Sequence, residues 1–97
     1  MIDLSEKQLK IINNILITNI PECEVWAFGS RVIGNARRNS DLDLVIRSNE
    51  LLPLRLLENL RDDFSLSDLT IIVDVIDWNN IDEPFMDIIK QKYFVMQ

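Results

Sequence analysis

The segment 28–44 restricts the fold more than any other stretch of the sequence. It reads Phe-Gly-Ser-Arg-Val-Ile-Gly-Asn-Ala-Arg-Arg-Asn-Ser-Asp-Leu-Asp-Leu, so an apolar run ends in Gly29-Ser30 and two aspartates later alternate with two leucines. Side chains alternate between the faces of a β-strand, which puts Asp41 and Asp43 on one side, about 7 Å apart at a rise of ~3.3 Å per residue. Two carboxylates so placed repel each other unless a cation lies between them, and such hard oxygen ligands suit Mg²⁺. This pattern predicts a strand over 41–47 with a metal site on one face.

The start of the same segment has the features of a phosphate-binding turn. Gly29 permits a tight turn and a close approach of the backbone to a ligand. Ser30 can cap a short helix, and the free backbone N–H groups at a helix start attract phosphate. One continuous segment therefore offers a phosphate site followed by a metal site.

These residues resemble the signature of the polymerase-beta-like nucleotidyltransferase superfamily, which is Gly29-Ser30, ten residues, then Asp41-Leu42-Asp43. The longer pattern Gly-Ser-Arg-x-x-Gly-x-x-Arg-x-x-Ser-Asp-Leu-Asp-Leu is similar to that of its smallest members, the minimal nucleotidyltransferases of prokaryotes. Those are commonly MntA-type antitoxins paired with a HEPN-domain toxin. The resemblance covers roughly residues 5–97. It implies one minimal nucleotidyltransferase domain over 1–97, with the α/β fold of that superfamily: a small mixed β-sheet flanked by helices.

The resemblance also implies a third catalytic aspartate on a strand beside the Asp-x-Asp strand. Asp74 lies inside the most apolar run of the chain and matches the expected apolar-Asp-apolar pattern. Asp77 is the competing candidate, but it lies at the end of the strand, where a solvated capping role is enough to explain an aspartate. For Asp74, the alternative to catalysis is a buried ion pair with an arginine such as Arg47. The catalytic and metal-binding residues implied are Asp41, Asp43 and Asp74, with two Mg²⁺ ions as cofactor.

The nucleotide-binding residues implied by the resemblance lie between the glycine turn and the aspartates. They are Gly29, Ser30, Arg31, Arg37 and Ser40, with Arg37 preferred to Arg38 because its position recurs in the family pattern. For each arginine, ordinary surface charge is the alternative interpretation.

Composition excludes several other kinds of function. Ten Lys and Arg against sixteen Asp and Glu give a net charge of −6, which argues against broad nucleic-acid binding, so no direct nucleic-acid partner is expected. With no histidine and a single cysteine, Cys23, neither a zinc site nor a Cys–His nucleophile nor an internal disulfide is expected. No segment has the apolar length of a membrane span, and the start does not read as a signal peptide. A cytoplasmic location is therefore predicted, and the resemblance implies a prokaryotic source.

Hydrophobic periodicity predicts alternating helices and strands. Helices are expected at 5–19, 53–64 and 79–90, strands at 24–28, 41–47 and 69–76, a short helix or loop at 31–39, and a short strand or helix tail at 92–96. The β-branched run 69–76 is predicted to be a central strand beside 41–47. The sheet should have three to five strands, with helices mainly on one side and Trp26 and Trp78 in the core.

The resemblance implies an Mg-dependent transfer of NMP, AMP from ATP, to a hydroxyl of a partner protein. The acceptor implied is a tyrosine of a cognate HEPN-type RNase toxin, in a hetero-oligomer with the antitoxin. Two alternatives stay open at this point: a binding-only antitoxin with a vestigial site, and a nucleotidyltransferase that acts on RNA or a small molecule.

Overall fold

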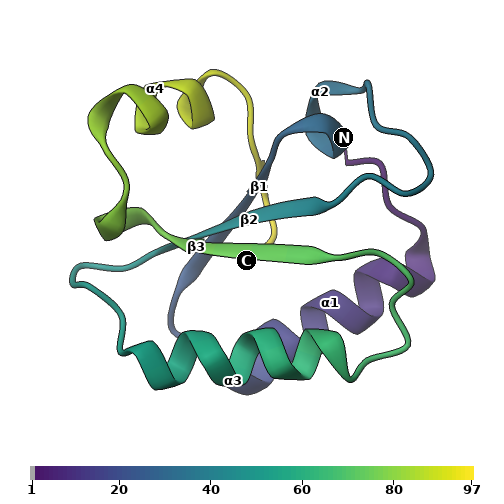
Figure 1. Ribbon diagram of the computed structural model, residues 1–97, viewed down its shortest axis with the longest axis horizontal. Coiled ribbons are helices and arrows are strands. Elements are labelled where there is room, and N and C mark those ends of the chain that lie inside the picture. The colour runs from purple at the N-terminus through teal and green to yellow at the C-terminus, as the bar shows by residue number, and fades with distance from the viewer. Residues whose placement is uncertain (1) are drawn as a thin grey trace.

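Four strands form one mixed sheet in the computed structural model, which describes residues 2–97 (Figure 1). They are β1 (Glu24–Phe28), β2 (Leu42–Arg47), β3 (Val73–Asp77) and β4 (Phe94–Val95), in the order β3-β2-β1-β4. β1 pairs antiparallel with both β2 and β4. β2 and β3 are parallel, because the chain returns between them through the crossover helix α3 (Leu54–Ser65).

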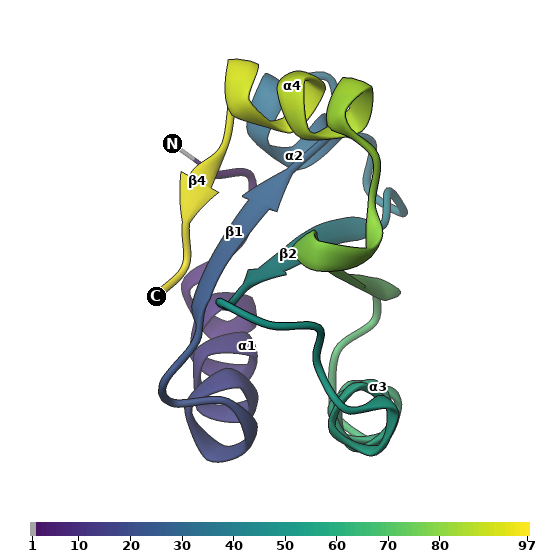
Figure 2. The same ribbon diagram turned by 90° about the vertical axis from the view of Figure 1, so that its left-hand side faces the viewer.

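Helices cover both faces of this sheet (Figures 1 and 2). α1 (Glu6–Asn19) and α3 lie against one face, and α4 (Glu83–Gln91) lies against the other, preceded by the short 3₁₀ helix η1 (Trp78–Asn80). α2 (Ser30–Ile33) follows directly on β1. The expected capping box starts α1, since Ser5 Oγ accepts from the Gln8 N–H and the Gln8 side chain accepts from the Ser5 N–H.

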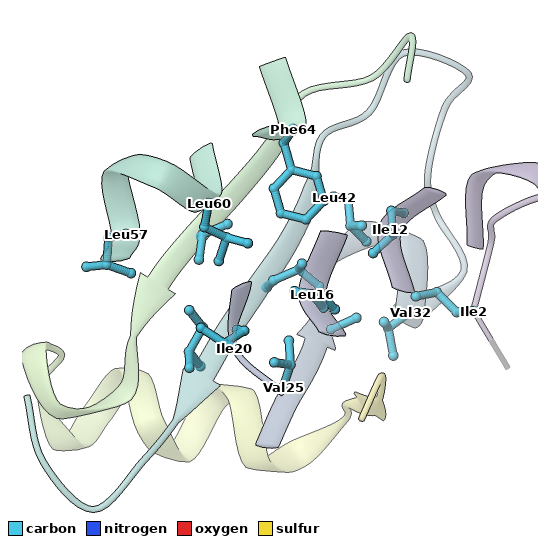
Figure 3. Close-up of a cluster of buried hydrophobic side chains, with 14 residues drawn as sticks. Ile2, Ile12, Leu16, Ile20, Val25, Val32, Leu42, Leu57, Leu60 and Phe64 are labelled. Carbon is cyan, nitrogen blue, oxygen red and sulfur yellow. The ribbon is translucent and has the colours of Figure 1, made fainter. Parts of the chain in front are cut away.

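The larger hydrophobic core lies between the sheet and the pair α1 and α3 (Figure 3). Alternate residues of β2 supply its sheet side, while the helices supply the apolar stripes that their periodicity predicts. Fully buried members are Ile12, Leu16, Val25, Ala27, Leu42, Leu44, Ile46 and Leu60. Because the even-numbered residues of β2 point into this core, its odd-numbered residues point to the opposite face of the sheet.

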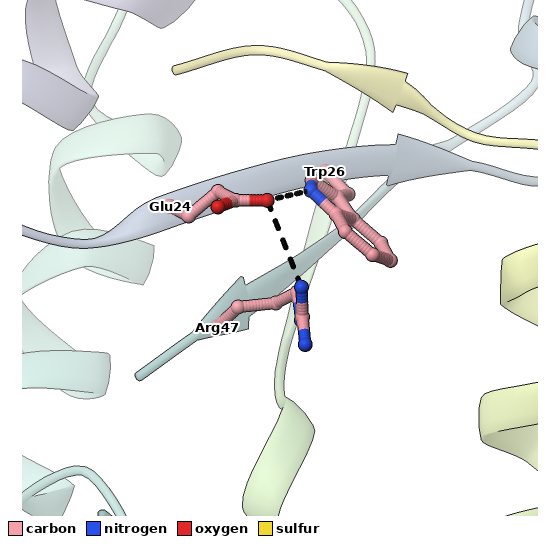
Figure 4. A network of polar contacts seen from close by, with 3 residues as sticks. All are labelled: Glu24, Trp26 and Arg47. Carbon is pink, nitrogen blue, oxygen red and sulfur yellow. Dashed lines mark hydrogen bonds and ion pairs between the residues drawn. The ribbon is translucent and has the colours of Figure 1, made fainter. Parts of the chain in front are cut away.

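A second, smaller core lies under α4 and contains Trp26, Val45, Trp78 and Ile89. The guanidinium carbon of Arg47 lies 4.2 Å from the ring centroid of Trp26 and 4.8 Å from that of Trp78. Glu24 holds this arrangement, because its carboxylate accepts from the Trp26 indole N–H and lies 3.7 Å from Arg47 Nη1 (Figure 4). The prediction that both tryptophans belong to the core is confirmed.

Two details of the predicted architecture were wrong. β3 is an edge strand, and residues 69–72 are not part of it. The apolar run looked like a central strand because Leu69 and Ile71, in the preceding loop, also pack against the larger core. Helices were expected mainly on one side, but the apolar face of α4 covers the second face of the sheet.

No helix within residues 2–97 combines the length and the apolar character that crossing a lipid bilayer requires.

Candidate active site

One row of residues crosses three strands on the sheet face that carries α4. Phe28 of β1, Asp43 of β2 and Asp74 of β3 are partners in the register of the sheet. Asp43 faces this way because Leu42 and Leu44 on either side of it are turned into the larger core. Neighbouring strands are about 4.8 Å apart, so the two carboxylates lie side by side. The expectation that 41–46 and 70–76 contribute neighbouring strands is confirmed.

The carboxyl group of Asp43 is in an unfavourable place for a negative charge. Its pKa is raised, first by burial and then by the charges of Asp74 and Asp41. Asp41 comes just before β2 and is exposed, as is Asp74. The one ion pair found within residues 2–97 joins Arg47 to Glu24, so no protein cation neutralises these carboxylates.

The structure therefore brings Asp43 and Asp74 together and places Asp41 close enough to act on Asp43. Over residues 2–97, no three His, Cys, Asp or Glu side chains converge into a ready-made metal site. The donor set nevertheless fits a hard divalent cation, since it consists of acceptor-only oxygens whose mutual repulsion such an ion relieves.

Gly29 packs directly against one of these carboxylates. Its φ is +81°, and a Cβ built on it lies 2.4 Å from Asp43 Oδ2. The glycine of the motif is thus required for contact with the aspartate as well as for the turn. The prediction that Ser30 caps α2 is wrong, because Ser30 is the first residue of that helix and Gly29 is its N-cap, with no side-chain cap hydrogen bond. Ser30 is half-buried, and within the described residues its hydroxyl makes no hydrogen bond, which leaves it free for a ligand.

Arg31 is turned into the protein. It is 5% exposed, and its guanidinium donates to the carbonyl oxygens of Ser40 (Nε, 3.0 Å), Asp3 (Nη1, 2.9 Å) and Arg38 (Nη2, 3.1 Å). Ser40 Oγ accepts from the Arg37 N–H at 2.8 Å. Two of the predicted nucleotide contacts, Arg31 and Ser40, are therefore engaged in holding the loop between α2 and β2. The side chain of Arg37 is exposed on that loop.

The environments expected for Asp74 and Asp77 were reversed. Asp74 is exposed, whereas Asp77 is 5% exposed. Asp77 accepts from the backbone N–H of Leu52 at 2.7 Å and of Asn79 at 2.9 Å, so it caps η1 and fastens the preceding loop. The alternative that Asp74 pairs with Arg47 is excluded, because Arg47 pairs with Glu24 and packs on the tryptophans.

A cleft of about 540 Å³ opens beside the two carboxylates. Phe28 and Phe85 line it in an edge-on pair with ring centroids 5.7 Å apart, and Arg61 lines its far side. Arg61 reaches it from α3, where its Nη2 donates to the Val75 carbonyl at 2.8 Å. Sequence reasoning missed both residues: Phe85 was one apolar position in a helix, and the place of Arg61 depends on how α3 crosses β3.

Comparisons with known proteins show which proteins the chain is similar to. The family model for the nucleotidyltransferase domain matches residues 9–97. A relative from Haemophilus influenzae, named Probable protein adenylyltransferase MntA, is 44% identical over 96 residues, which cover 99% of this chain and 84% of the relative. A solved structure of a toxin–antitoxin with AMP-PNP has a TM-score of 0.76 at 23% identity, over 92% of this chain and 72% of that one. A mutant of the toxin–antitoxin MntA–HpeT has a TM-score of 0.71 at 25% identity, over 95% and 71%.

Proposed function

Because the chain belongs to the nucleotidyltransferase domain family, as a minimal member of MntA type, we propose that this enzyme transfers AMP from ATP to a protein hydroxyl and so acts as an antitoxin. The proposed acceptor is a tyrosine of a HEPN-type RNase toxin that assembles with it. The name of the relative supports adenylyl transfer to protein. The structural neighbours, which are toxin–antitoxins, support a toxin as the partner.

The register of Asp43 with Asp74, next to Gly29, carries this proposal. A protein that acted by contact alone would gain nothing from unpaired carboxylates that repel one another, because their repulsion costs stability. The same carboxylates are useful if a cation and a triphosphate complete the site.

Two Mg²⁺ ions would be held by Asp41, Asp43 and Asp74. When bound there, the metal would offset the charge of the phosphates and lower the pKa of an acceptor hydroxyl. The raised pKa of Asp43, with burial as its main cause, fits a carboxylate that is completed by a cation.

The remaining residues have separate parts in the proposed reaction. Gly29 lets the Asp43 carboxylate pack against the turn. The free hydroxyl of Ser30 donates to the oxygens of the triphosphate. Arg37 adds positive charge from the loop, which Arg31 and Ser40 hold in place.

The acceptor oxygen forms a bond to the α-phosphorus while the bond from that phosphorus to the bridging oxygen breaks. Pyrophosphate leaves with the electron pair of that bond. The hydroxyl proton passes to a carboxylate of the row and then to solvent. The products are the AMP ester of the acceptor and pyrophosphate.

The test uses a cognate HEPN-type toxin as acceptor, to be sought in the reading frame next to the gene of this protein. Incubation with this protein, ATP and Mg²⁺ should add the mass of one AMP to it. Ser30→Ala should slow transfer by about ten- to a hundredfold through poorer positioning of the triphosphate. Asp43→Asn should nearly abolish transfer, while Asp62→Asn, an exposed aspartate on α3, should transfer as the wild type does. A binding-only antitoxin gives the opposite result: no mass change, with the Asp43→Asn protein still neutralising the toxin.

A further inference from the structure

We propose that the acceptor protein docks along the outer edge of β3, on a surface formed by residues 69–74 and Arg61. This inference rests on the function proposed above. It adds the side from which the acceptor arrives and the residues that receive it.

The direction of approach follows from the order of residues across the sheet. In phosphoryl transfer, the attacking and leaving oxygens lie roughly in line on opposite sides of the phosphorus. In the proposed reaction the triphosphate lies at the Gly29 turn, at the end of β1. The carboxylate row runs from that end through Asp43 to Asp74. The acceptor must therefore come from the Asp74 side. β3 is the edge strand there, so the acceptor has to pass over its edge.

That edge carries a groove that is continuous with the active site. A cavity of about 460 Å³ lies along it, lined among others by Phe64, Leu69, Ile72 and Asp74. Asp74 and Arg61 line both this groove and the 540 Å³ cleft beside the carboxylates. A segment in the groove therefore has direct access to the reacting centre.

The groove offers both an apolar contact and backbone groups to a partner. Ile72 is 65% exposed, so its apolar side chain is available to a partner at this edge. The Ile72 carbonyl accepts from the Leu42 N–H on the β2 side, so by alternation the Val73 and Val75 carbonyls point outward. Arg61 donates a hydrogen bond to the Val75 carbonyl. An extended segment of the acceptor can pair with the backbone groups on the outer edge of β3 that Arg61 does not bind.

The test measures the rate of AMP transfer against the concentration of the cognate HEPN-type toxin, the acceptor of the proposed function. Ile72→Glu should raise KM for that protein about tenfold or more, with kcat at saturating acceptor and affinity for AMP-PNP within about twofold of wild type. Ile17→Glu is the matched control, since Ile17 is 61% exposed but lies on α1. Arg61→Met should also raise KM, whereas Arg55→Met on the same helix should not. Thermal unfolding checks that each variant is folded.

Three results would overturn the inference. The first is an Ile72→Glu protein that behaves as Ile17→Glu does. The second is a rise in KM for Ile88→Glu instead, since Ile88 is 61% exposed on α4 and lines a cavity with Gly29, on the pyrophosphate side. The third is a wild-type protein that transfers no AMP, in which case the proposed function fails as well. Normal transfer with no effect at Ile72 overturns the docking surface alone.

Discussion

Gly29 and Asp43 come from separated parts of the sequence motif and touch in the folded protein. Gly29→Ala should lower the free energy of unfolding for two reasons, the backbone strain at φ +81° and the clash of the new Cβ with Asp43 Oδ2. Strain of this kind costs about 1–3 kcal/mol. Gly34→Ala is the matched control, because Gly34 has φ +104° and nothing within 4 Å of its Cβ position. Chemical denaturation of both variants should show the larger loss for Gly29→Ala.

A double-variant cycle separates the two causes. In the Asp43→Ala background the clash is absent, so Gly29→Ala should cost only about as much as Gly34→Ala does. An equal cost of Gly29→Ala with and without the Asp43 carboxylate would contradict the contact.

Asp43 also gives a prediction on pH. Because burial, then Asp74 and Asp41, raise its pKa in the folded state, ionisation of Asp43 destabilises the fold. The protonated Asp43 carboxyl stabilises the fold fully at pH values below its ordinary pKa of 3.8. This stabilisation is lost as the pH rises through the raised pKa of the folded state. Without metal, Asp43→Asn should therefore raise the melting temperature near pH ~7, with the gain shrinking toward acid pH.

Magnesium should reverse the order of these two melting temperatures and make the wild type the more stable protein. If the carboxylates hold Mg²⁺, its addition should raise the melting temperature of the wild type and leave that of Asp43→Asn unchanged. Equal stabilisation of both proteins would mean that the ion binds elsewhere.

At the scale of single residues, the motif residues could be chosen from the sequence, but the burial and the hydrogen bonds of their neighbours could not be predicted from it. Spacing and strand alternation led to Gly29, Asp41 and Asp43 as candidate site residues, and that choice stays a prediction. Spacing did not distinguish the exposed Asp74 from the buried Asp77. The Asn79 amide that Asp77 binds is local, but the Leu52 amide comes from a loop that only the fold brings near.

Among the elements, the loop between α2 and β2 depends on a single buried side chain. Arg31 joins it to the N-terminal segment and to its own far end through three carbonyl groups. Arg31→Met should lower the free energy of unfolding by about 2–3 kcal/mol, because buried carbonyl groups lose a charged partner. Hydrogen exchange should show faster exchange across residues 35–41.

Arg38→Met is the control for this element, since the Arg38 side chain is exposed and only its carbonyl is used. Its effect on stability should stay within about 0.5 kcal/mol. A similar loss for both variants, or unchanged exchange in Arg31→Met, would contradict the role given to Arg31.

The boundaries of most elements were predictable because each has a local signal. The capping box marks the start of α1, and the apolar stripe of α3 has the helical period. The position of β3 at the sheet edge was not predictable, since a β-branched run looks the same whether it pairs on one side or two. Only the pairing of β1 with both β2 and β4 reveals that β3 has one neighbour.

On the scale of the whole molecule, two helical layers position one row of polar groups. The larger core between the sheet and α1 with α3 turns alternate residues of β2 away from itself. α4 covers part of the face that these residues reach and leaves the carboxylates open to a cleft. The fold class could be predicted because helical and strand periods alternate along the chain. The second helical layer could not, because periodicity does not say which face of a sheet a helix covers.

The central claim is that Asp43 and Asp74 form the metal-dependent nucleotide site of this protein. Calorimetry with AMP-PNP tests it most directly, in the presence and absence of Mg²⁺, for the wild type, the Asp43→Asn/Asp74→Asn variant and the Asp62→Asn control. Binding by the wild type and the control should require Mg²⁺, and the double variant should bind at least about tenfold more weakly, which is ~1.4 kcal/mol. Equal affinity of the wild type and the double variant, or wild-type binding that persists without Mg²⁺, would contradict it.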